Sequence, residues 1–181
     1  MTHRIILFRG MNTGGVRAPV GEQRAMAEAM GLRNPRTLLA SGNLVVESDR
    51  DPRELEDAIE AETEVRFGRR IETIVRTSDQ FEALIAANPM QAEAEQAPTR
   101  LLVMVMKDGI RSGGLEAIRA FAKGDERVEA VSAPGGEALF FWHPDGIGVS
   151  KMAEKAQPRL IGTGTGRNWN TMLKLAEMIR A

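Results

Sequence analysis

Seven residues near the start of the chain, Arg9 to Gly15, have the composition of an anion-binding loop. Three of them are glycines, which leave the backbone free to turn and its amides free to point at a ligand. Arg9 supplies a cation, and Arg17 follows closely. The loop leaves an apolar segment and leads toward a helix, whose first amides lack intrahelical partners and attract negative charge. The spacing predicts a cradle for a small anion, although the same residues also fit a tight turn in which Asn12 bonds its own backbone.

Three further polar clusters have residue types suited to binding. Ser41-Gly42-Asn43 is typical of a turn between two strands. Asp145 to Lys151 contains an Asp-Gly turn, a serine suited to cap a helix, and a lysine near a helix start, where a cation is favoured only if an anion is close. The fourth cluster is Thr165 to Asn170. The predicted ligand-binding residues are Arg9, Asn12, Gly14, Gly15, Ser41, Asn43, Asp145, Ser150, Lys151, Arg167, Asn168 and Asn170.

The sequence contains no recognisable motif for catalysis or metal binding. The two histidines, His3 and His143, have no metal-ligand spacing, and the chain has no cysteine, so no metal site is predicted. Neither serine of the polar clusters stands in a Gly-x-Ser-x-Gly elbow. The alternating glycines at 162, 164 and 166 match neither a Walker A loop nor a dinucleotide fingerprint. Catalytic residues and a cofactor therefore stay unknown.

Composition narrows the class of protein. The 181 residues are 43% hydrophobic, enough for a sizeable core, and the formal net charge is -1, which argues against a general polyanion binder. Residues 1–50 hold seven Lys/Arg against four Asp/Glu, and residues 146–181 hold six against two, so both ends are basic. Without cysteine, a signal peptide or an apolar run long enough for a membrane span, the chain is expected to be soluble and cytoplasmic.

The order of elements in residues 1–76 predicts a ferredoxin-like unit. Apolar runs predict strands at residues 4–8, 36–40, 44–47 and 71–75. One helix is expected after Pro19, and a second begins at Asp51-Pro52, which has the pattern of an N-cap followed by a first-turn proline. The sequence strand, helix, strand, strand, helix, strand is the split βαβ pattern.

Residues 77–181 repeat this theme loosely. A helix capped by Thr77-Ser78-Asp79 precedes a strand at 101–106, a helix that contains Ile118, and a hairpin of strands at 128–131 and 138–142. Helical segments are expected after Ser150 and after Asn168. The predicted fold class is therefore α+β, with two ferredoxin-like (α/β-plait) units that meet near residue 76.

The polar clusters also carry a resemblance to a known family. RGMNTGG, SGN, DGIGVSK and RNWNT occur in this order, and they resemble the bacterial family called domain of unknown function 1697, whose members show RGxNxGG, SGN, DGIGxSK and RNWNT. The resemblance implies two α/β-plait-like units and brings no established activity. Met11, Thr13 and His143 depart from the usual pattern; an aromatic is common at position 143, so the resemblance gives His143 no catalytic role.

The leading functional hypothesis is a site for a small anionic ligand, such as one that bears a phosphate, formed where the N- and C-terminal motif loops meet. A nucleic-acid-binding module is an alternative, because split βαβ sheets often bind RNA, but such sheets need exposed aromatics. Aromatic residues are only 4% of this chain, and it has no tyrosine. A structural or protein-interaction domain without catalysis is the third hypothesis. The oligomeric state is not predicted.

Overall fold

The computed structural model describes residues 2–13, 17–40 and 42–181. The chain divides into two compact units, one of residues 1–81 with 177–181 and one of residues 82–176. Their helices and strands are β1 Thr2–Phe8, α1 Val20–Ala29, β2 Arg33–Thr37, β3 Asn43–Ser48, α2 Pro52–Phe67, β4 Thr73–Thr77, α3 Ser78–Ala86, α4 Gln91–Gln96, η1 Pro98–Arg100, β5 Leu101–Met106, α5 Gly114–Arg119, β6 Arg127–Ala133, β7 Gly136–Trp142, η2 Ile147–Val149, α6 Lys151–Lys155, α7 Pro158–Ile161, β8 Gly164–Asn168 and α8 Trp169–Arg180.

Each unit contains one four-stranded antiparallel sheet with the same topology. The order is β2-β3-β1-β4 in the first sheet and β6-β7-β5-β8 in the second. In both, the first and third strands of the unit are central and the second and fourth are at the edges. This is the order of a split βαβ unit, so the predicted fold class of two ferredoxin-like units is confirmed.

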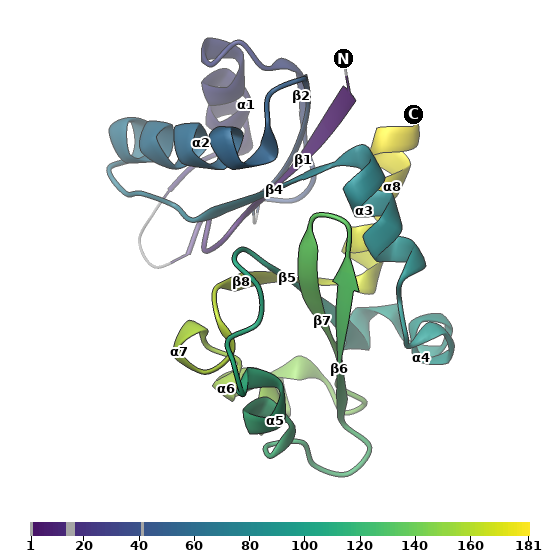
Figure 1. Cartoon of the computed structure of the whole chain (residues 1–181). Helices are drawn as coiled ribbons and strands as arrows, with labels where there is room; N and C mark the ends of the chain where they lie inside the picture. The colour runs from purple at the N-terminus through teal and green to yellow at the C-terminus, as the bar shows by residue number, and fades with distance from the viewer. Residues whose placement is uncertain (1, 14–16, 41) are drawn as a thin grey trace. The chain divides into compact units, whose positions relative to one another are not determined.

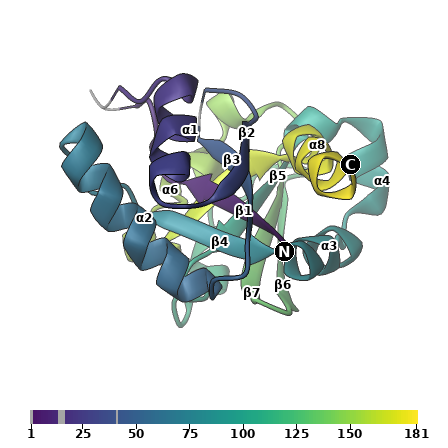
Figure 2. The ribbon, with the colours of Figure 1, turned by 90° about the horizontal axis from the view of Figure 1, so that it is seen from above.

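The core of the first unit lies between its sheet and two helices. Helices α1 and α2 cover the same face of the sheet (Figures 1 and 2). Strand β1 sends Ile6 and Phe8 to this side because alternate residues of a strand point to one face, and both are fully buried. Leu55 and Ile59, one turn apart on α2, are buried against them. The predicted helix start is confirmed, since the Asp51 side chain accepts hydrogen bonds from the amides of Arg53 and Glu54.

Helix α2 also protects the edge strand β4. Glu56 Oε1 accepts a hydrogen bond from the Val75 amide at 2.9 Å, and Glu60 Oε1 accepts one from the Thr73 amide at 3.0 Å. The two carboxylates are four residues apart on one helical face, and the two amides are two residues apart along the strand, so the spacings match. Exposed strand edges invite pairing with other chains, and these glutamates occupy that edge from within the unit.

The core of the second unit lies between the sheet and the short helices α5, α6 and α7. Met106, Phe141 and Leu139 from the strands pack with Ile118 of α5 and Ile161 of α7. Gly114, at the start of α5, permits this packing, because a Cβ there would lie 2.8 Å from the Leu160 carbonyl oxygen. Helices α5 and α7 are therefore in close backbone contact.

One predicted strand needs correction, and one strand was not predicted. The strand expected at 36–40 runs instead over Arg33–Thr37, because Leu39 has a φ of 62° and so leaves the extended conformation. The strand Gly164–Asn168 was not predicted from the sequence at all. Its residues include two glycines and an asparagine, which are depleted in strands.

The glycines of β8 serve strand packing. A Cβ on Gly164 would lie 2.7 Å from Met106 Sδ and 2.9 Å from Met104 Cγ, and one on Gly166 would lie 3.2 Å from the Leu102 side chain. The alternation of glycine therefore follows the two-residue period of a strand against β5, which agrees with the interpretation that this segment is no phosphate loop. Among the described residues, no helix is both long and apolar enough to cross a bilayer.

Candidate functional site

In the first unit, the predicted anion loop and the SGN turn lie next to each other. We call residues 9–13, 37–40 and 42–43 the loop pair. Asn12, which has a φ of 59°, ties it together. Its Nδ2 donates to the carbonyl oxygens of Ala18 at 3.0 Å and Ala40 at 2.6 Å, and its Oδ1 accepts from the Ala18 amide at 2.6 Å. The Asn12 amide group is therefore occupied by the protein's own backbone.

Gly42 and Asn43 complete this packing. Gly42 has a φ of +93°, and a Cβ there would lie 2.7 Å from Met11 Cβ and 2.8 Å from Phe8 Cβ. Asn43 is fully buried, and its Nδ2 donates to the Leu38 carbonyl oxygen at 2.8 Å. A glycine and a short amide at these positions are thus explained by turn geometry.

Arg9 is the half-exposed cation of the loop pair. Its Nη1 lies 3.7 Å from Glu72 Oε2, and the Arg9 amide donates to the Glu72 carbonyl oxygen at 2.9 Å. The ion pair is exposed and therefore weak, so Arg9 keeps the capacity to exchange partners. Gly14, Gly15 and Ser41, which were also predicted to bind, lie outside the described residues.

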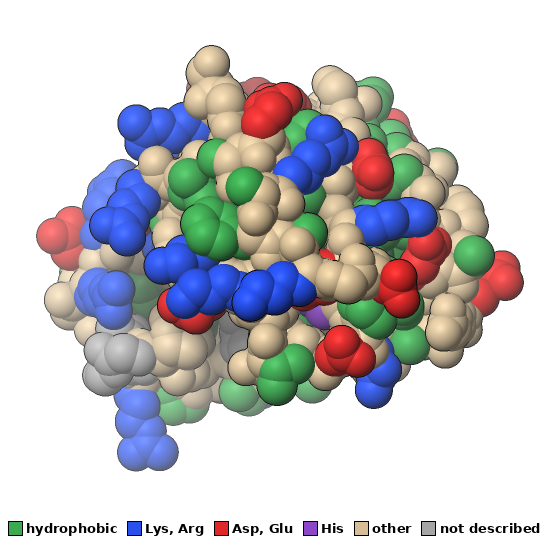
Figure 3. Space-filling model, turned by 90° about the horizontal axis from the view of Figure 1, so that it is seen from below, with side chains coloured by type: hydrophobic (Ala, Val, Ile, Leu, Met, Phe, Trp, Pro, Cys, Tyr) green, Lys and Arg blue, Asp and Glu red, His purple; other side chains and the backbone are tan. Residues whose placement is uncertain are grey.

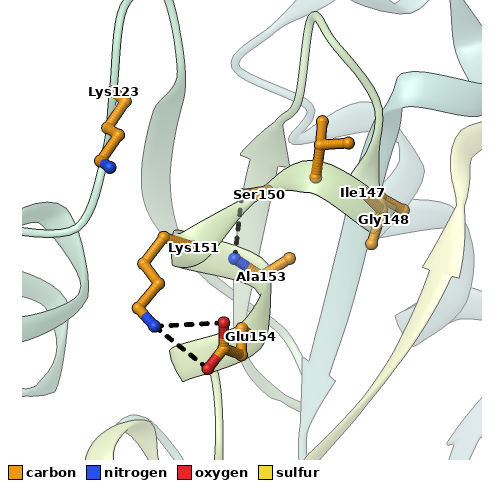
Figure 4. A pocket seen from close by; sticks show the side chains of 8 residues that line it. Lys123, Ile147, Gly148, Ser150, Lys151, Ala153 and Glu154 are labelled. Atoms are coloured by element: carbon orange, nitrogen blue, oxygen red, sulfur yellow. Dashed lines mark hydrogen bonds and ion pairs between the residues drawn. The ribbon is translucent and has the colours of Figure 1, made fainter.

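In the second unit, the predicted residues Ser150 and Lys151 line a cavity of about 520 Å³. We call it the Ser150 cavity; its lining residues are Lys123, Ile147, Gly148, Val149, Ser150, Lys151, Ala153 and Glu154 (Figure 4). Lys151 Nζ is 3.2 Å and 3.3 Å from the two carboxylate oxygens of Glu154. Lys123 comes from the segment after α5, and its amine has no hydrogen-bond or ion-pair partner within the described part of the chain. Two lysines from separate segments thus line one cavity.

Ser150 is held by two hydrogen bonds at the wall of this cavity. Its Oγ accepts from the Ala153 amide at 3.0 Å, which makes it the N-cap of α6 as predicted, and donates to Glu126 Oε2 at 2.5 Å. His143 Nδ1 lies 3.2 Å from the same Glu126 oxygen. The carboxylate therefore stands between serine and histidine, whereas activation of a serine nucleophile needs the histidine next to the hydroxyl. The cluster fixes the loop and offers no hydrolase geometry.

Burial and hydrogen bonding shift the pKa of both titratable groups of this cluster. Burial lowers the pKa of His143, and the contact with Glu126 only partly offsets this. Burial acts to raise the pKa of Glu126, but hydrogen bonds from Ser150, His143 and the Lys123 amide outweigh it, so this pKa lies below its usual value. Near neutral pH the pair is a neutral imidazole and a carboxylate. His143 Nε2 is buried and has no hydrogen-bond partner among the described residues.

The remaining predicted residues of the second unit have separate positions. Asp145 is exposed in the Asp-Gly turn, where Gly146 has a φ of +98°. Arg167 is buried on β8, donates to Thr165 Oγ1 at 2.7 Å, and has a pKa lowered by burial to about 10. Asn168 caps α8 by accepting a hydrogen bond from the Thr171 amide at 2.9 Å, and Asn170 is exposed in the first turn of that helix.

The predicted set is therefore divided between the units. Asn12 and Asn43 interact through the loop pair of the first unit, whereas Ser150 and Lys151 share a cavity of the second. That loops of both units form one site stays a prediction. Sequence reasoning missed Lys123, because it stands in an acidic stretch without a motif. Within the described ranges, no cluster of three or more His, Asp or Glu side chains has the geometry to hold a metal ion.

Comparison with known proteins gives a family and a fold. Residues 1–134 match the family described as "Protein of unknown function (DUF1697)". The structure of the conserved bacterial protein SP0830 from Streptococcus pneumoniae is similar over 98% of each chain, with a TM-score of 0.75 and 21% sequence identity. At this identity the likeness shows the fold alone. Comparison with curated proteins found no match.

Proposed function

The chain belongs to the DUF1697 family, whose description states no function, and we propose that it binds a small anionic ligand in the Ser150 cavity of its second unit. The observation that carries the proposal is that Lys123 and Lys151 both line a cavity built on the DGIGVSK motif. The Lys123 amine has no partner within the described residues, so a bound anion would supply one. The cavity of about 520 Å³ is in the range of small-molecule sites.

Lys151 supports the proposal because its present partner is weak. The ion pair with Glu154 joins residues three apart on one helix, and both side chains are well exposed, at 45% and 62%. Exposed pairs of this kind contribute about 0.2–1 kcal/mol. A bound anion that also contacts Lys123 replaces this interaction at little cost.

The position of Ser150 limits what else the site does. The Ser150 hydroxyl already donates to Glu126 and accepts from the Ala153 amide. Ser150 therefore stabilises the cavity wall and is not assigned the role of a nucleophile. The proposal is therefore for binding, and it assigns no reaction.

The alternative of nucleic-acid binding has no comparable support. Recognition of single-stranded RNA on a sheet relies on exposed aromatic side chains. Six of the eight aromatic residues of this chain are buried, namely Phe8, Phe81, Phe140, Phe141, Trp142 and Trp169. The hypothesis of a structural or protein-interaction domain without catalysis is the outcome that remains if no anion binds.

The test is a calorimetric titration of the protein with inorganic phosphate, repeated on single and double variants. Lys123→Gln and Lys151→Gln each remove one cation from the cavity. We expect each to weaken phosphate binding in this cavity about threefold to tenfold, and the double variant to lose binding in this cavity. Lys174→Gln, an exposed lysine on α8 with the same change in charge, is the matched control and is expected to bind like the parent. Equal affinities of the double variant and the control, in proteins with unchanged circular dichroism, would refute the proposal.

A further inference from the structure

A second cavity of the same unit has a different lining and no part in the motifs. It has a volume of about 610 Å³, and its lining includes Arg111, Phe121, Glu154, Lys155, Arg159 and Leu160. We call it the Arg159 cavity. Glu154 lines both this cavity and the Ser150 cavity. Lys155, which lines only the Arg159 cavity, is the last residue of the same helix, α6. Figure 3, which views the protein from the side on which α5, α6 and α7 are drawn in Figure 1, shows several Lys and Arg side chains next to one another.

The charge of this lining is unbalanced. Three of the named residues are cations and one is a carboxylate. None of Arg111, Lys155 and Arg159 forms an ion pair with a carboxylate within the described part of the chain; the Arg111 guanidinium donates only to the Arg159 carbonyl oxygen, at 2.8 Å. The single carboxylate, Glu154, is engaged by Lys151. Cations that line one cavity without ion-pair partners favour an anionic ligand. If the anion is a phosphate, an arginine side chain can bind it through two parallel hydrogen bonds.

The backbone that carries these cations is fixed. The Arg111 amide donates to the Ile161 carbonyl oxygen at 2.9 Å, which joins the segment after β5 to α7. Gly162 allows this approach, because a Cβ there would lie 2.8 Å from the Gly109 carbonyl oxygen. The close contact between α5 and α7 at Gly114 holds the same two segments together. Arg111 and Arg159 thus stand on two segments that are bonded directly to each other.

The apolar part of the lining distinguishes this cavity from a bare anion site. Phe121 and Leu160 are partly buried and pack against the core cluster of the second unit, yet both line the cavity. An aromatic ring that is anchored on one side and accessible on the other offers a surface for another ring. A ligand that satisfies both parts of the lining carries a negative group at one end and an aromatic body at the other.

We infer that the Arg159 cavity binds an organic phosphate with an aromatic body, with the phosphate on Arg111, Lys155 and Arg159 and the ring against Phe121. This inference concerns a site separate from the Ser150 cavity and does not depend on an anion binding there. The two share Glu154 but no cation.

Calorimetric titrations with phenyl phosphate and with inorganic phosphate test the inference. Phenyl phosphate is expected to bind about tenfold more tightly, because only it fills the apolar part of the cavity. Arg159→Gln and Lys155→Gln are expected to weaken phenyl phosphate binding about tenfold and about threefold. Phe121→Leu keeps the side chain apolar and is expected to remove the preference for phenyl phosphate over inorganic phosphate.

Lys123→Gln, which changes the neighbouring cavity alone, separates this inference from the proposed function. Under the inference it leaves phenyl phosphate binding unchanged. Loss of that binding in Lys123→Gln but not in Arg159→Gln would overturn the inference and leave the Ser150 cavity as the site. Equal affinity for the two phosphates would also overturn it, since the aromatic body would then make no contact.

Discussion

The loop pair of the first unit and the Ser150 cavity of the second are both built on motifs rich in glycine and polar residues, but their polar atoms have different partners. In the loop pair, the Asn12 amide makes three hydrogen bonds to main-chain atoms, and Asn43 is buried on the Leu38 carbonyl oxygen. At the Ser150 cavity, Lys123 has no partner among the described residues, and Lys151 has only an exposed ion pair. Motifs of similar composition therefore differ in function according to whether their polar side chains are hydrogen-bonded to the protein's own backbone or remain available to a ligand.

Gly42→Ala is the strongest test of the structural role of the loop pair. Its Cβ would meet Met11 Cβ at 2.7 Å in a residue of φ +93°, so both strain and overpacking act, and we expect a loss of about 3 kcal/mol in the free energy of unfolding. Gly31→Ala is the matched control: its φ is +77°, and nothing lies within 4 Å of the added Cβ, so only about 1 kcal/mol is lost. Urea unfolding measures both. Equal losses would mean that the loops do not pack as described.

Asn12→Ala sharpens the comparison by separating stability from binding. The substitution leaves the Ala18 amide and the Ala40 carbonyl oxygen without the Asn12 side chain, whereas the Ala18 carbonyl oxygen keeps its hydrogen bond from Gln23 Nε2. We expect a loss of about 2 kcal/mol in unfolding free energy. Thr13→Ala, which removes one exposed hydrogen bond to the Gly10 carbonyl oxygen, is expected to cost less than about 1 kcal/mol. Phosphate affinity of the folded Asn12→Ala protein is expected to match the parent. A large loss of affinity with little loss of stability would place the ligand at the loop pair instead.

The pH dependence of stability tests the cluster beside the Ser150 cavity. Burial sets the pKa of His143 below its ordinary value, so on acidification the unfolded chain takes up a proton near pH 6.5 before the folded chain does. Stability is then full above about pH 6.5 and falls as the pH drops toward the folded-state pKa, with a slope of at most about 1.4 kcal/mol per pH unit. The lowered pKa of Glu126 acts in the same direction, below the ordinary Glu value of 4.5.

Unfolding midpoints in urea at pH 7, 6 and 5 measure this dependence. The His143→Gln variant lacks the buried imidazole and is expected to show a flatter profile than the parent. Parallel profiles for the two proteins would show that His143 does not titrate as its burial implies.

Glu154→Gln gives the smallest effect and the most specific one. The substitution releases Lys151 and removes the carboxylate that both cavities share, so phosphate affinity is expected to rise about threefold. Unfolding free energy is expected to change by less than about 0.5 kcal/mol, because the side chain is exposed. Glu116→Gln on α5 is the control of equal charge change. Unchanged affinity in Glu154→Gln would indicate that Lys151 does not contact the ligand.

Most of the fold followed from residue patterns, and the strand that was missed depends on residues far away in the chain. The Asp51-Pro52 start of α2 and the apolar strand β5 were predicted because each has a strong local signal. Strand β8 was missed because its glycines are selected by the side chains of β5 across the sheet.

For the candidate site, the motif identified Ser150 and Lys151 but not the residues that complete the cavities. Lys123, Arg111 and Arg159 come from segments that the fold brings together, and no spacing along the chain marks them. For Asn12 the sequence allowed either a ligand or the protein's own backbone as a partner, and the structure gives its side chain backbone partners 6 and 28 residues away. That Asn12 also binds a ligand stays a prediction.

The central claim, that anions bind to the cations of the second unit, is tested most directly by an NMR titration of the isotope-labelled protein with inorganic phosphate. Backbone amide shifts are expected at residue 123 and across residues 147–160, with residues 9–13 and 37–40 unaffected. Shifts confined to residues 9–13 and 37–40, or no shifts at all, would contradict the account.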